Sequence, residues 1–307
     1  MARWLVASIP SPSSGVLHLG PLVVHMYGLM LLAGIAACIA LTGLRWTRPL
    51  AWSAEARAVP ATLLGRRDWD LVFRVAVWGV AAGVVGARIY HLLTSWSEVP
   101  EPKWKGAFEI WNGGLGIWGG IFLGSLVGAA IVHRAGADVL RFMDAVAPGL
   151  LLAQGIGRWG NWWNQELFGK PTSLPWALRI DPAHRPPGYL HYATFHPTFL
   201  YEFSWNLFGV AVLLLVGRRF RIRPAGLFAL YVSWYTLFRS YEEILRIDPG
   251  SHYYFGLRLN FFVSVGVFAL ATGFFLVWQI LRYRARDQNR RTAAPREGLA
   301  GVNGSPE

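Results

Sequence analysis

The stretch that decides the fold is residues 157–169, which read GRWGNWWNQELFG. It ends a long apolar run, yet it contains one Arg, two Asn, one Gln and one Glu among three glycines and three tryptophans. A soluble loop has no need of so many Trp residues, and a plain membrane span has no need of Arg158 or Glu166. Ionisable groups at membrane depth cost about 2.5–3.5 kcal/mol each and usually persist because they serve a function. The stretch therefore predicts a polar pocket in an apolar wall.

The composition of the whole chain also indicates a membrane protein. Of its 307 residues, 54% are hydrophobic and only 15% are charged, which favours the membrane class. A net charge of +12 would suggest a nucleic-acid partner in a soluble protein. Here the arginines cluster at the ends of apolar runs, which indicates membrane orientation instead, so no nucleic-acid partner is expected. The single cysteine, Cys38, excludes intrachain disulfides and cysteine-cluster metal sites.

Apolar runs of spanning length define the expected architecture. A bilayer requires about 20 residues per helix, and about seven such runs are present. The sequence predicts an all-α polytopic membrane protein with about seven transmembrane helices over residues 1–284. It also predicts a long outward-facing loop region at 158–196 and a disordered basic cytoplasmic tail at 285–307. The spans are expected near 21–44, 69–93, 111–133, 138–157, 197–216, 225–245 and 258–281.

The loops alternate in charge, which predicts the orientation. The first, third and fifth loops and the tail carry arginines, and the fifth reads Arg218, Arg219, Arg221 and Arg223. By the positive-inside rule these segments are cytoplasmic. The N-terminus is then outside and the C-terminus in the cytoplasm.

With this topology, ionisable residues of several spans fall in the outer half of the membrane. Tyr235, Arg239 and Glu243 are spaced i, i+4, i+8 and so share one helix face. A charge inside lipid has to pair or face a wet cavity, so one cavity near the outer surface is predicted to hold the group. Its other members are expected to be His25, Tyr27, Arg88, Tyr90, His91, Asn112, Arg158, His196, Tyr201 and Glu202.

Two interpretations of this group remain open. Pairs such as Arg239 with Glu243 or Glu202 can be structural ion pairs that fix helix packing. Alternatively Arg88, Arg158 and Arg239 form an anion site, since Arg presents a fork of donors that matches phosphate. An anion in the outer leaflet is most simply a phospholipid headgroup. The pattern indicates lipid phosphate without specifying a reaction.

The stretch at 157–169 resembles the signature of the bacterial prolipoprotein diacylglyceryl transferase family. Four further segments resemble the family in the same order over roughly residues 20–280. They are 20–30 in the first span, 112–120 in the third, HPTFLYE at 196–202, and Tyr235, Arg239 and Glu243 in the sixth.

The resemblance implies a seven-span catalytic domain in the bacterial plasma (inner) membrane, with its active site toward the outer face. Such an enzyme transfers the diacylglyceryl group from phosphatidylglycerol to the thiol of a lipobox cysteine. A thioether forms and glycerol phosphate is released, in the first step of lipoprotein maturation. The implied partners are phosphatidylglycerol, prolipoprotein signal peptides with a lipobox cysteine, and the lipid bilayer. No metal or organic cofactor is implied.

The family pattern also implies residue roles. Arg158 would hold the lipid headgroup and Arg239 would help to stabilise the departing phosphate, since donors aimed at developing charge are usually the largest catalytic contribution. The remaining substrate-binding residues would be Asn161, Asn164 and Glu166 around the headgroup, Glu202 and Glu243 orienting the arginines, Gly169 allowing close backbone approach, and Tyr27 and Tyr235 as hydrogen-bond donors.

The general base is the point at which the sequence departs from the family. Many members carry a His in the third span where this chain has Trp118, and an indole cannot accept a proton. His91 and His196 are the candidate catalytic bases, although His196, directly before Pro197, can also be purely structural. A third alternative is that the arginine field alone lowers the pKa of the thiol.

Three other functions compete with this interpretation. A phospholipid or anion transporter would need access from both faces, whereas the polar residues cluster on one side and no inverted repeat is apparent. An intramembrane serine protease would need a G-x-S-x-G motif, which is missing. A membrane scaffold would use Arg158 and Arg239 only as ion-pair residues.

Overall fold

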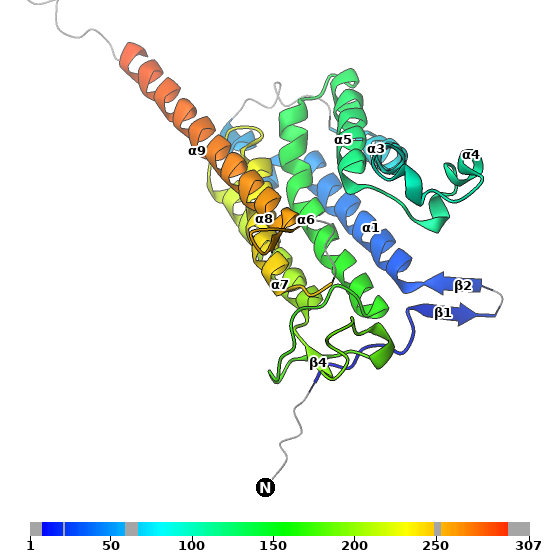
Figure 1. The fold of residues 1–307 in the computed structure, drawn as a ribbon. Helices are drawn as coiled ribbons and strands as arrows, with labels where there is room; N and C mark the ends of the chain where they lie inside the picture. Colours follow the sequence, from blue (N-terminus) through cyan, green and yellow to red (C-terminus); the bar gives the residue numbers. More distant parts are fainter. Residues whose placement is uncertain (1–7, 21, 59–66, 249–252, 294–307) are drawn as a thin grey trace, which may run out of the picture.

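The computed structural model describes residues 8–20, 22–58, 67–248 and 253–293. It is mostly helical, with the long helices packed side by side (Figure 1). Within the described residues, seven helices have 18 residues or more. They are α1 (Met26–Thr47), α3 (Trp69–Thr94), α5 (Ile117–Arg134), α6 (Val139–Asn164), α7 (Thr198–Arg219), α8 (Gly226–Leu245) and α9 (Leu259–Ala293).

Six of these helices are long and apolar enough to cross a membrane. The predicted mostly helical, polytopic membrane architecture is confirmed at this level. The exception is α8, whose second half carries Arg239, Glu242 and Glu243. Two of these charges, Arg239 and Glu243, are those that the sequence placed in a polar site.

Short elements connect the long helices. Three antiparallel strand pairs occur in the described part of the chain, where the sequence predicted only helices and loops. They are β1 (Val16–Leu19) with β2 (Leu22–His25), β3 (Leu178–Arg179) with β4 (Thr194–Phe195), and β5 (Tyr253–Tyr254) with β6 (Leu257–Arg258). The short helices are α2 (Pro49–Trp52), α4 (Lys103–Gly106) and 3-10 turns at 56–58, 96–98, 110–112 and 182–184.

Three predicted boundaries differ from the structure. The expected first span at 21–44 begins as strand β2, and α1 starts only at Met26, whose N–H donates to Gly15. The expected loop at 158–196 begins later, because α6 continues to Asn164 and ends where Gln165 adopts a left-handed conformation (φ 51°). The expected disordered tail at 285–307 is helical through Ala293, and the rest of it lies outside the described residues.

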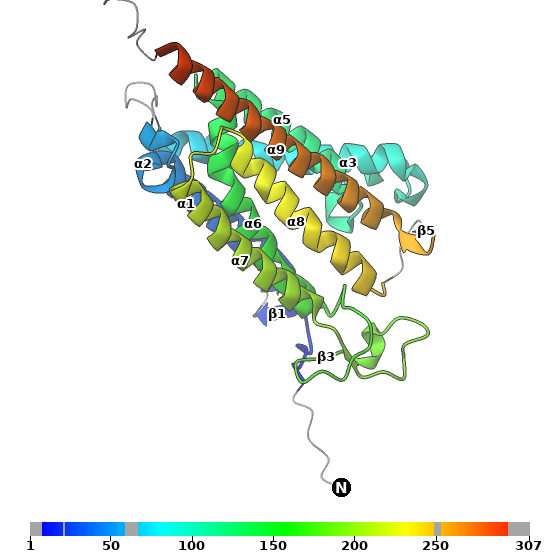
Figure 2. The same cartoon turned by 90° about the vertical axis from the view of Figure 1, so that its left-hand side faces the viewer.

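Helix α6 is the centre of the bundle and packs against α1, α7 and α8 (Figure 2). Ala147 and Leu151 of α6 form a buried cluster with Val210 and Leu213 of α7 and with Leu227 and Tyr231 of α8. At the end of the bundle near β1 and β3, a second cluster holds the 165–197 segment onto α6 and α7. Its buried members are Phe168, Leu178, Ile180, Phe195 and Phe199.

Helices α3 and α5 pack through glycines. A Cβ atom placed on Gly86 would collide with the carbonyl oxygen of Gly119, and one placed on Gly119 would collide with that of Gly86. The backbones therefore approach more closely than any larger residue allows, as in other membrane helix pairs with small residues at the interface.

We expect Gly119→Ala to lower the free energy of unfolding by about 1–3 kcal/mol, the usual cost of overpacking. Gly266→Ala in α9 is the matched control, because no other atom lies within 4 Å of its added Cβ. Thermal unfolding of the two variants in detergent measures the difference. Equal melting temperatures would contradict the close contact between α3 and α5.

Candidate active site

Three glycines shape the last turns of α6, from which Arg158 projects. A Cβ on Gly155 would meet Asn206 of α7 at 3.3 Å, whereas one on Gly160 would meet the ring of Tyr27 at 2.6 Å. A Cβ on Gly157 would have Leu31 of α1 at 3.9 Å. The glycines thus let α1 and α7 approach α6 on either side. Tyr27, one of the predicted site residues, packs directly on this part of α6.

Arg158 is held by acceptors from three helices. Its Nη2 lies 2.6 Å from Oε2 of Glu202 on α7 and 3.7 Å from Oε2 of Glu242 on α8. Its Nη1 donates to Oδ1 of Asn161 at 3.3 Å. The guanidinium side chain is 15% exposed, whereas Glu202 and Glu242 are each 1% exposed. Carboxylates this deeply buried require a partner, since an unpaired buried charge is strongly destabilising.

Arg239 meets Arg158 at the same carboxylate. It forms short ion pairs with Glu242 and Glu243, and the Glu242 oxygen that it contacts is the one facing Arg158. The structure therefore brings together the two arginines that the sequence predicted to converge. The predicted partner Glu243 lies beside Arg239, and Glu202 lies beside Arg158.

The ion pairs continue beyond α8. Glu243 lies 3.6 Å from Arg246 and 3.4 Å from Arg258, and Asp248 lies 2.6 Å and 3.4 Å from the same two arginines. Burial alone would raise the pKa of Asp248, but the hydrogen bonds and charges of Arg246 and Arg258 hold it below the ordinary value. We call these residues the arginine–carboxylate network. Its members are Arg158, Glu202, Arg239, Glu242, Glu243, Arg246, Asp248 and Arg258.

Four of these eight residues were not found from the sequence. Glu242 is adjacent to the predicted Glu243, and Arg246 follows Glu243 by three residues, which is contact spacing on a helix. These two could have been included. Asp248 and Arg258 lie in the connection to α9, and no periodicity links them to the site.

Tyr235 lies within electrostatic range of Arg158, Arg239 and Glu202. It is one turn before Arg239 on α8, as the i, i+4 spacing predicted. Tyr235 is therefore a neighbour of the network.

A chain of amides leads from the network to a cavity. Asn161 donates to Oε1 of Glu166 at 2.8 Å, and Asn164 donates to the same oxygen at 3.4 Å. Glu166 and Asn164 line a cavity of about 350 Å³ whose other wall is the N-terminal segment 12–16. Gln165 fixes that segment by donating to the Pro12 carbonyl at 2.9 Å. Asn161 therefore contacts both Arg158 and Glu166, and Glu166 and Asn164 also line the cavity.

Gly169 ties the end of the signature to α8. Its backbone pairs with Arg246, and its N–H donates to the carbonyl of His196 at 3.0 Å. An added Cβ would lie 2.9 Å from the Cβ of His196 and 3.3 Å from the carbonyl oxygen of Leu245. A larger residue at position 169 would therefore crowd His196 and the end of α8, which is why a glycine fits here.

His196 lies at the start of α7, outside the membrane-spanning segments. Its Nδ1 is 3.1 Å from the hydroxyl of Tyr201, which accepts a hydrogen bond from Trp176 at 3.0 Å. The tautomer of the imidazole decides which of His196 and Tyr201 donates. Burial, and secondarily the charge of Lys170, lowers the pKa of His196. His196 is therefore neutral at pH 7.

Arg88, another predicted anion-site residue, binds the segment that follows α3. Its guanidinium donates to the carbonyls of Ala107, Gly113 and Gly114 at 2.8–3.0 Å, and also to that of Gly106. Its hydrogen bonds within the described chain all go to this segment, which they fold against α3. Four backbone carbonyls thus accept hydrogen bonds from Arg88, and its assignment to the anion site stays a prediction.

His91 belongs to the same region. A Cβ on Gly114 would lie 2.5 Å from Nε2 of His91 and 2.7 Å from Nη1 of Arg88, and Gly114 has a φ of +69°. The imidazole thus packs on the segment that Arg88 holds. Trp118, at the family's usual His position, is half-exposed at the start of α5.

Comparisons with known proteins agree with the geometry. A family model described as prolipoprotein diacylglyceryl transferase matches residues 14–291. A Frankia alni protein named phosphatidylglycerol–prolipoprotein diacylglyceryl transferase is 48% identical over 84% of this chain, which spans 64% of that protein's length. Proteins of the same name from Cutibacterium acnes and, with the suffix 2, Streptomyces coelicolor are 45% and 44% identical. These two matches cover 92% and 97% of this chain and 90% and 92% of the relatives. The chain belongs to the prolipoprotein diacylglyceryl transferase family.

Proposed function

We propose that this protein transfers the diacylglyceryl group of phosphatidylglycerol to the thiol of a lipobox cysteine in prolipoprotein signal peptides. The observation that carries the proposal is the meeting of Arg158 and Arg239 at Glu242. The names of the relatives, which cite phosphatidylglycerol and prolipoprotein, support the substrate pair.

We propose that α8 is a seventh transmembrane helix beside the six apolar ones. Its charged residues are paired with one another, with Arg158 of α6 or with residues that follow α8, and pairing lowers the cost of placing them at membrane depth. The charge of the loops favours an N-terminus outside and a C-terminus in the cytoplasm. The site would then face outward from a bacterial plasma (inner) membrane, and the catalytic domain would span residues 1–284.

The chemistry assigns a task to each arginine. The cysteine sulfur attacks the diacylglycerol carbon that carries the phosphate ester, a C–S bond forms, and the C–O bond to phosphate breaks. Negative charge then gathers on the departing glycerol phosphate while the thiol proton passes to a base. Arg158 binds the phosphate in the ground state, and Arg239 stabilises the charge as the bond breaks.

The carboxylates and the signature complete the site. Glu202, Glu242 and Glu243 hold the guanidinium groups in place before substrate arrives, so that little reorganisation is needed during the reaction. Asn161, Asn164 and Glu166 position the glycerol of the headgroup, which the adjoining cavity can accommodate. Tyr27, Tyr235 and the backbone at Gly169 make the further contacts to the substrate.

We favour His196 over His91 as the base because His196 adjoins Gly169, which pairs with Arg246 of the network. A base acts in its neutral form. The lowered pKa of His196 therefore predicts that the transfer rate is maximal above a pH of about 6.5, the ordinary pKa of His. The rate should fall as the pH drops through the lowered pKa of His196. We expect His196→Ala to remove this acid limb from the pH–rate profile and His91→Ala to keep it. If both variants retain the parent profile, neither His is the base.

A single assay separates this function from its rivals. Purified protein is given phosphatidylglycerol and a lipobox peptide, with the Cys→Ser peptide as the control. A mass increase equal to diacylglycerol, on the cysteine peptide alone, supports the transferase. A scaffold is the rival that one observation favours, since every guanidinium of the network has a carboxylate partner. Lipid binding without a mass increase would support a scaffold or a transporter.

A further inference from the structure

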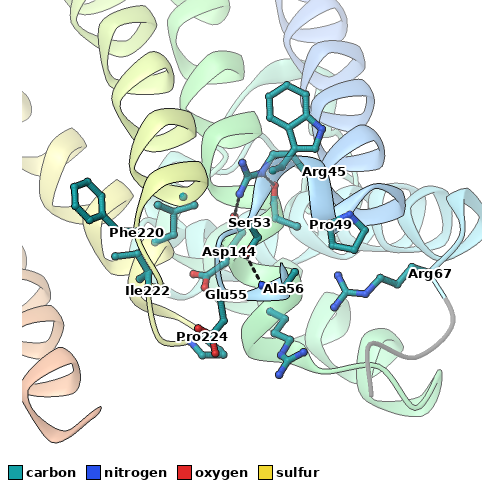
Figure 3. A pocket seen from close by; sticks show the side chains of 15 residues that line it. Arg45, Pro49, Ser53, Glu55, Ala56, Arg67, Asp144, Phe220, Ile222 and Pro224 are labelled. Atoms are coloured by element: carbon teal, nitrogen blue, oxygen red, sulfur yellow. Dashed lines mark hydrogen bonds between the residues drawn. The ribbon is translucent and has the colours of Figure 1, made fainter. Parts of the chain in front are cut away.

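A second polar cavity lies at the end of the bundle opposite to the arginine–carboxylate network. Its volume is about 60 Å³, and it is enclosed by α2, the end of α1 and the starts of α6 and α8 (Figure 3). Figure 2 shows α2 at one end of the bundle and β3, which follows the signature, at the other. Three arginines line this cavity, namely Arg45, Arg67 and Arg141, together with two carboxylates, Glu55 and Asp144.

Arg45 supplies a buried donor. It lies in the last turn of α1, is 5% exposed, and donates from Nε and Nη2 to the carbonyls of Ala145 and Asp144, each at 3.1 Å. Its Nη1 is buried and has no hydrogen-bond partner among the described residues. A buried donor left unsatisfied costs about 1–3 kcal/mol, so proteins usually provide a partner or bind one.

Two more arginines, Arg67 and Arg141, line the same cavity. Burial lowers the pKa of Arg67, and the nearby charge of Arg141 lowers it further, while Asp138 acts in the opposite direction. Arg67 lies 4.3 Å from the ring centre of Trp46, and Arg141 lies 3.2 Å from Asp138.

Asp144 accepts a hydrogen bond from the backbone N–H of Phe228 at 2.9 Å, so it serves to cap the start of α8. Three arginines and two acids line the cavity, and Asp138 adds a third carboxylate beside Arg141. A water-sized group needs roughly 15 Å³ of such volume, so the cavity has room for about four oxygen-sized atoms. A tetrahedral oxyanion has this size.

We propose that this cavity binds the phosphate group of an anionic ligand, held by Arg45, Arg67 and Arg141. Basic pockets between transmembrane helices on the cytoplasmic side are suited to acidic lipid headgroups, and free phosphate presents the same chemistry. The proposal goes beyond the transferase activity, and only the assignment of the cavity to the cytoplasmic leaflet rests on the proposed orientation.

The test is phosphate-ligand binding to the full chain, delipidated in detergent and measured by native mass spectrometry. All proteins carry Arg158→Gln, which weakens binding at the network, and the cavity and control variants are compared in this same background. The probes are dihexanoyl phosphatidic acid, inorganic phosphate and, as the zwitterionic control, dihexanoyl phosphatidylcholine. The cavity variant is Arg67→Gln/Arg141→Gln. The matched control, Arg219→Gln/Arg221→Gln, removes the same charge from exposed positions at the same end that do not line the cavity.

We expect one phosphatidic acid molecule to bind, with affinity lowered at least about tenfold in the cavity variant, since each hydrogen bond to a charged group is worth about that factor or more. The control variant should bind within about twofold of the parent. Tighter binding of phosphatidic acid than of phosphate identifies a lipid headgroup as the source, and equal binding identifies free phosphate. Both results support the cavity.

Equal affinities in the cavity and control variants, or no binding of either phosphate probe, would overturn the proposal. With Arg158 intact, the cavity variant should keep its transfer rate within about twofold of wild type. Failure of the wild-type protein to transfer diacylglycerol would remove the proposed function and leave the binding result standing, so the two ideas fail separately. Thermal unfolding checks that the variants fold.

Discussion

Arg158→Lys should lower the rate of diacylglyceryl transfer by about 100-fold or more, and Arg158→Ala should abolish transfer while the helical fold is kept. Removal of a single preorganised donor typically costs about 100–1000-fold in rate. Arg158 uses two nitrogens to meet Glu202, Glu242 and Asn161 at once. A lysine ammonium is one compact centre and cannot hold these partners and a phosphate in a bidentate geometry.

The measurement is the mass increase of the lipobox peptide with time, with circular dichroism to follow the fold. Arg74→Lys is the matched control, because the Arg74–Asp70 pair is largely exposed and such pairs contribute little. Its transfer rate should equal that of wild type. Turnover like that of wild type in Arg158→Ala would rule out the assignment of Arg158 to the headgroup.

Arg239→Gln should reduce both stability and transfer. It removes a partner from two buried carboxylates, Glu242 and Glu243. Breaking a buried ion pair from one side costs about 3–5 kcal/mol. We expect the lower end, about 3 kcal/mol, because Glu243 keeps Arg246 and Arg258. Transfer should fall by about 100-fold or more, since Arg239 is expected to stabilise the departing phosphate.

The double variant Arg239→Gln/Glu242→Gln separates these two effects. It removes one buried carboxylate together with the guanidinium that it pairs with, and Arg158 keeps Glu202, so most of the lost stability should return. Transfer should remain low, because no guanidinium group is restored. Thermal unfolding and the peptide assay on the same preparations measure the two quantities. Recovery of transfer along with stability would show that Arg239 only fixes helix packing.

The sequence located the long helices well because their signal is local. An apolar run of about 20 residues is visible without knowledge of the fold. The end of α6 was placed too early because Arg158, Asn161 and Asn164 suggested a loop, whereas these polar residues continue a helix whose partners come from α7 and α8. The strands β1 and β2 were missed because their apolar residues also fit the start of a span.

The sequence was enough to predict that charged residues converge at one site. It was less informative about which arginine pairs with which carboxylate. Positive-inside topology and the i, i+4 spacing were enough to expect Arg158 and Arg239 on the same side. Which carboxylate faces which arginine depends on the rotation of each helix about its axis, which spacing alone does not determine. For the same reason the spacing did not show that Arg88 donates to backbone carbonyls.

The pairing of α8 with earlier helices has a consequence for biogenesis. Its start is capped by Asp144 of α6, and its far half is neutralised in part by Arg158, also of α6. Given the seven-span arrangement, α8 on its own would present unmatched charge to lipid during synthesis. It has to partition from the translocon onto segments already inserted. The helices would therefore insert in a fixed order: α6 first, and then α8, the least apolar of the long helices, which packs against it.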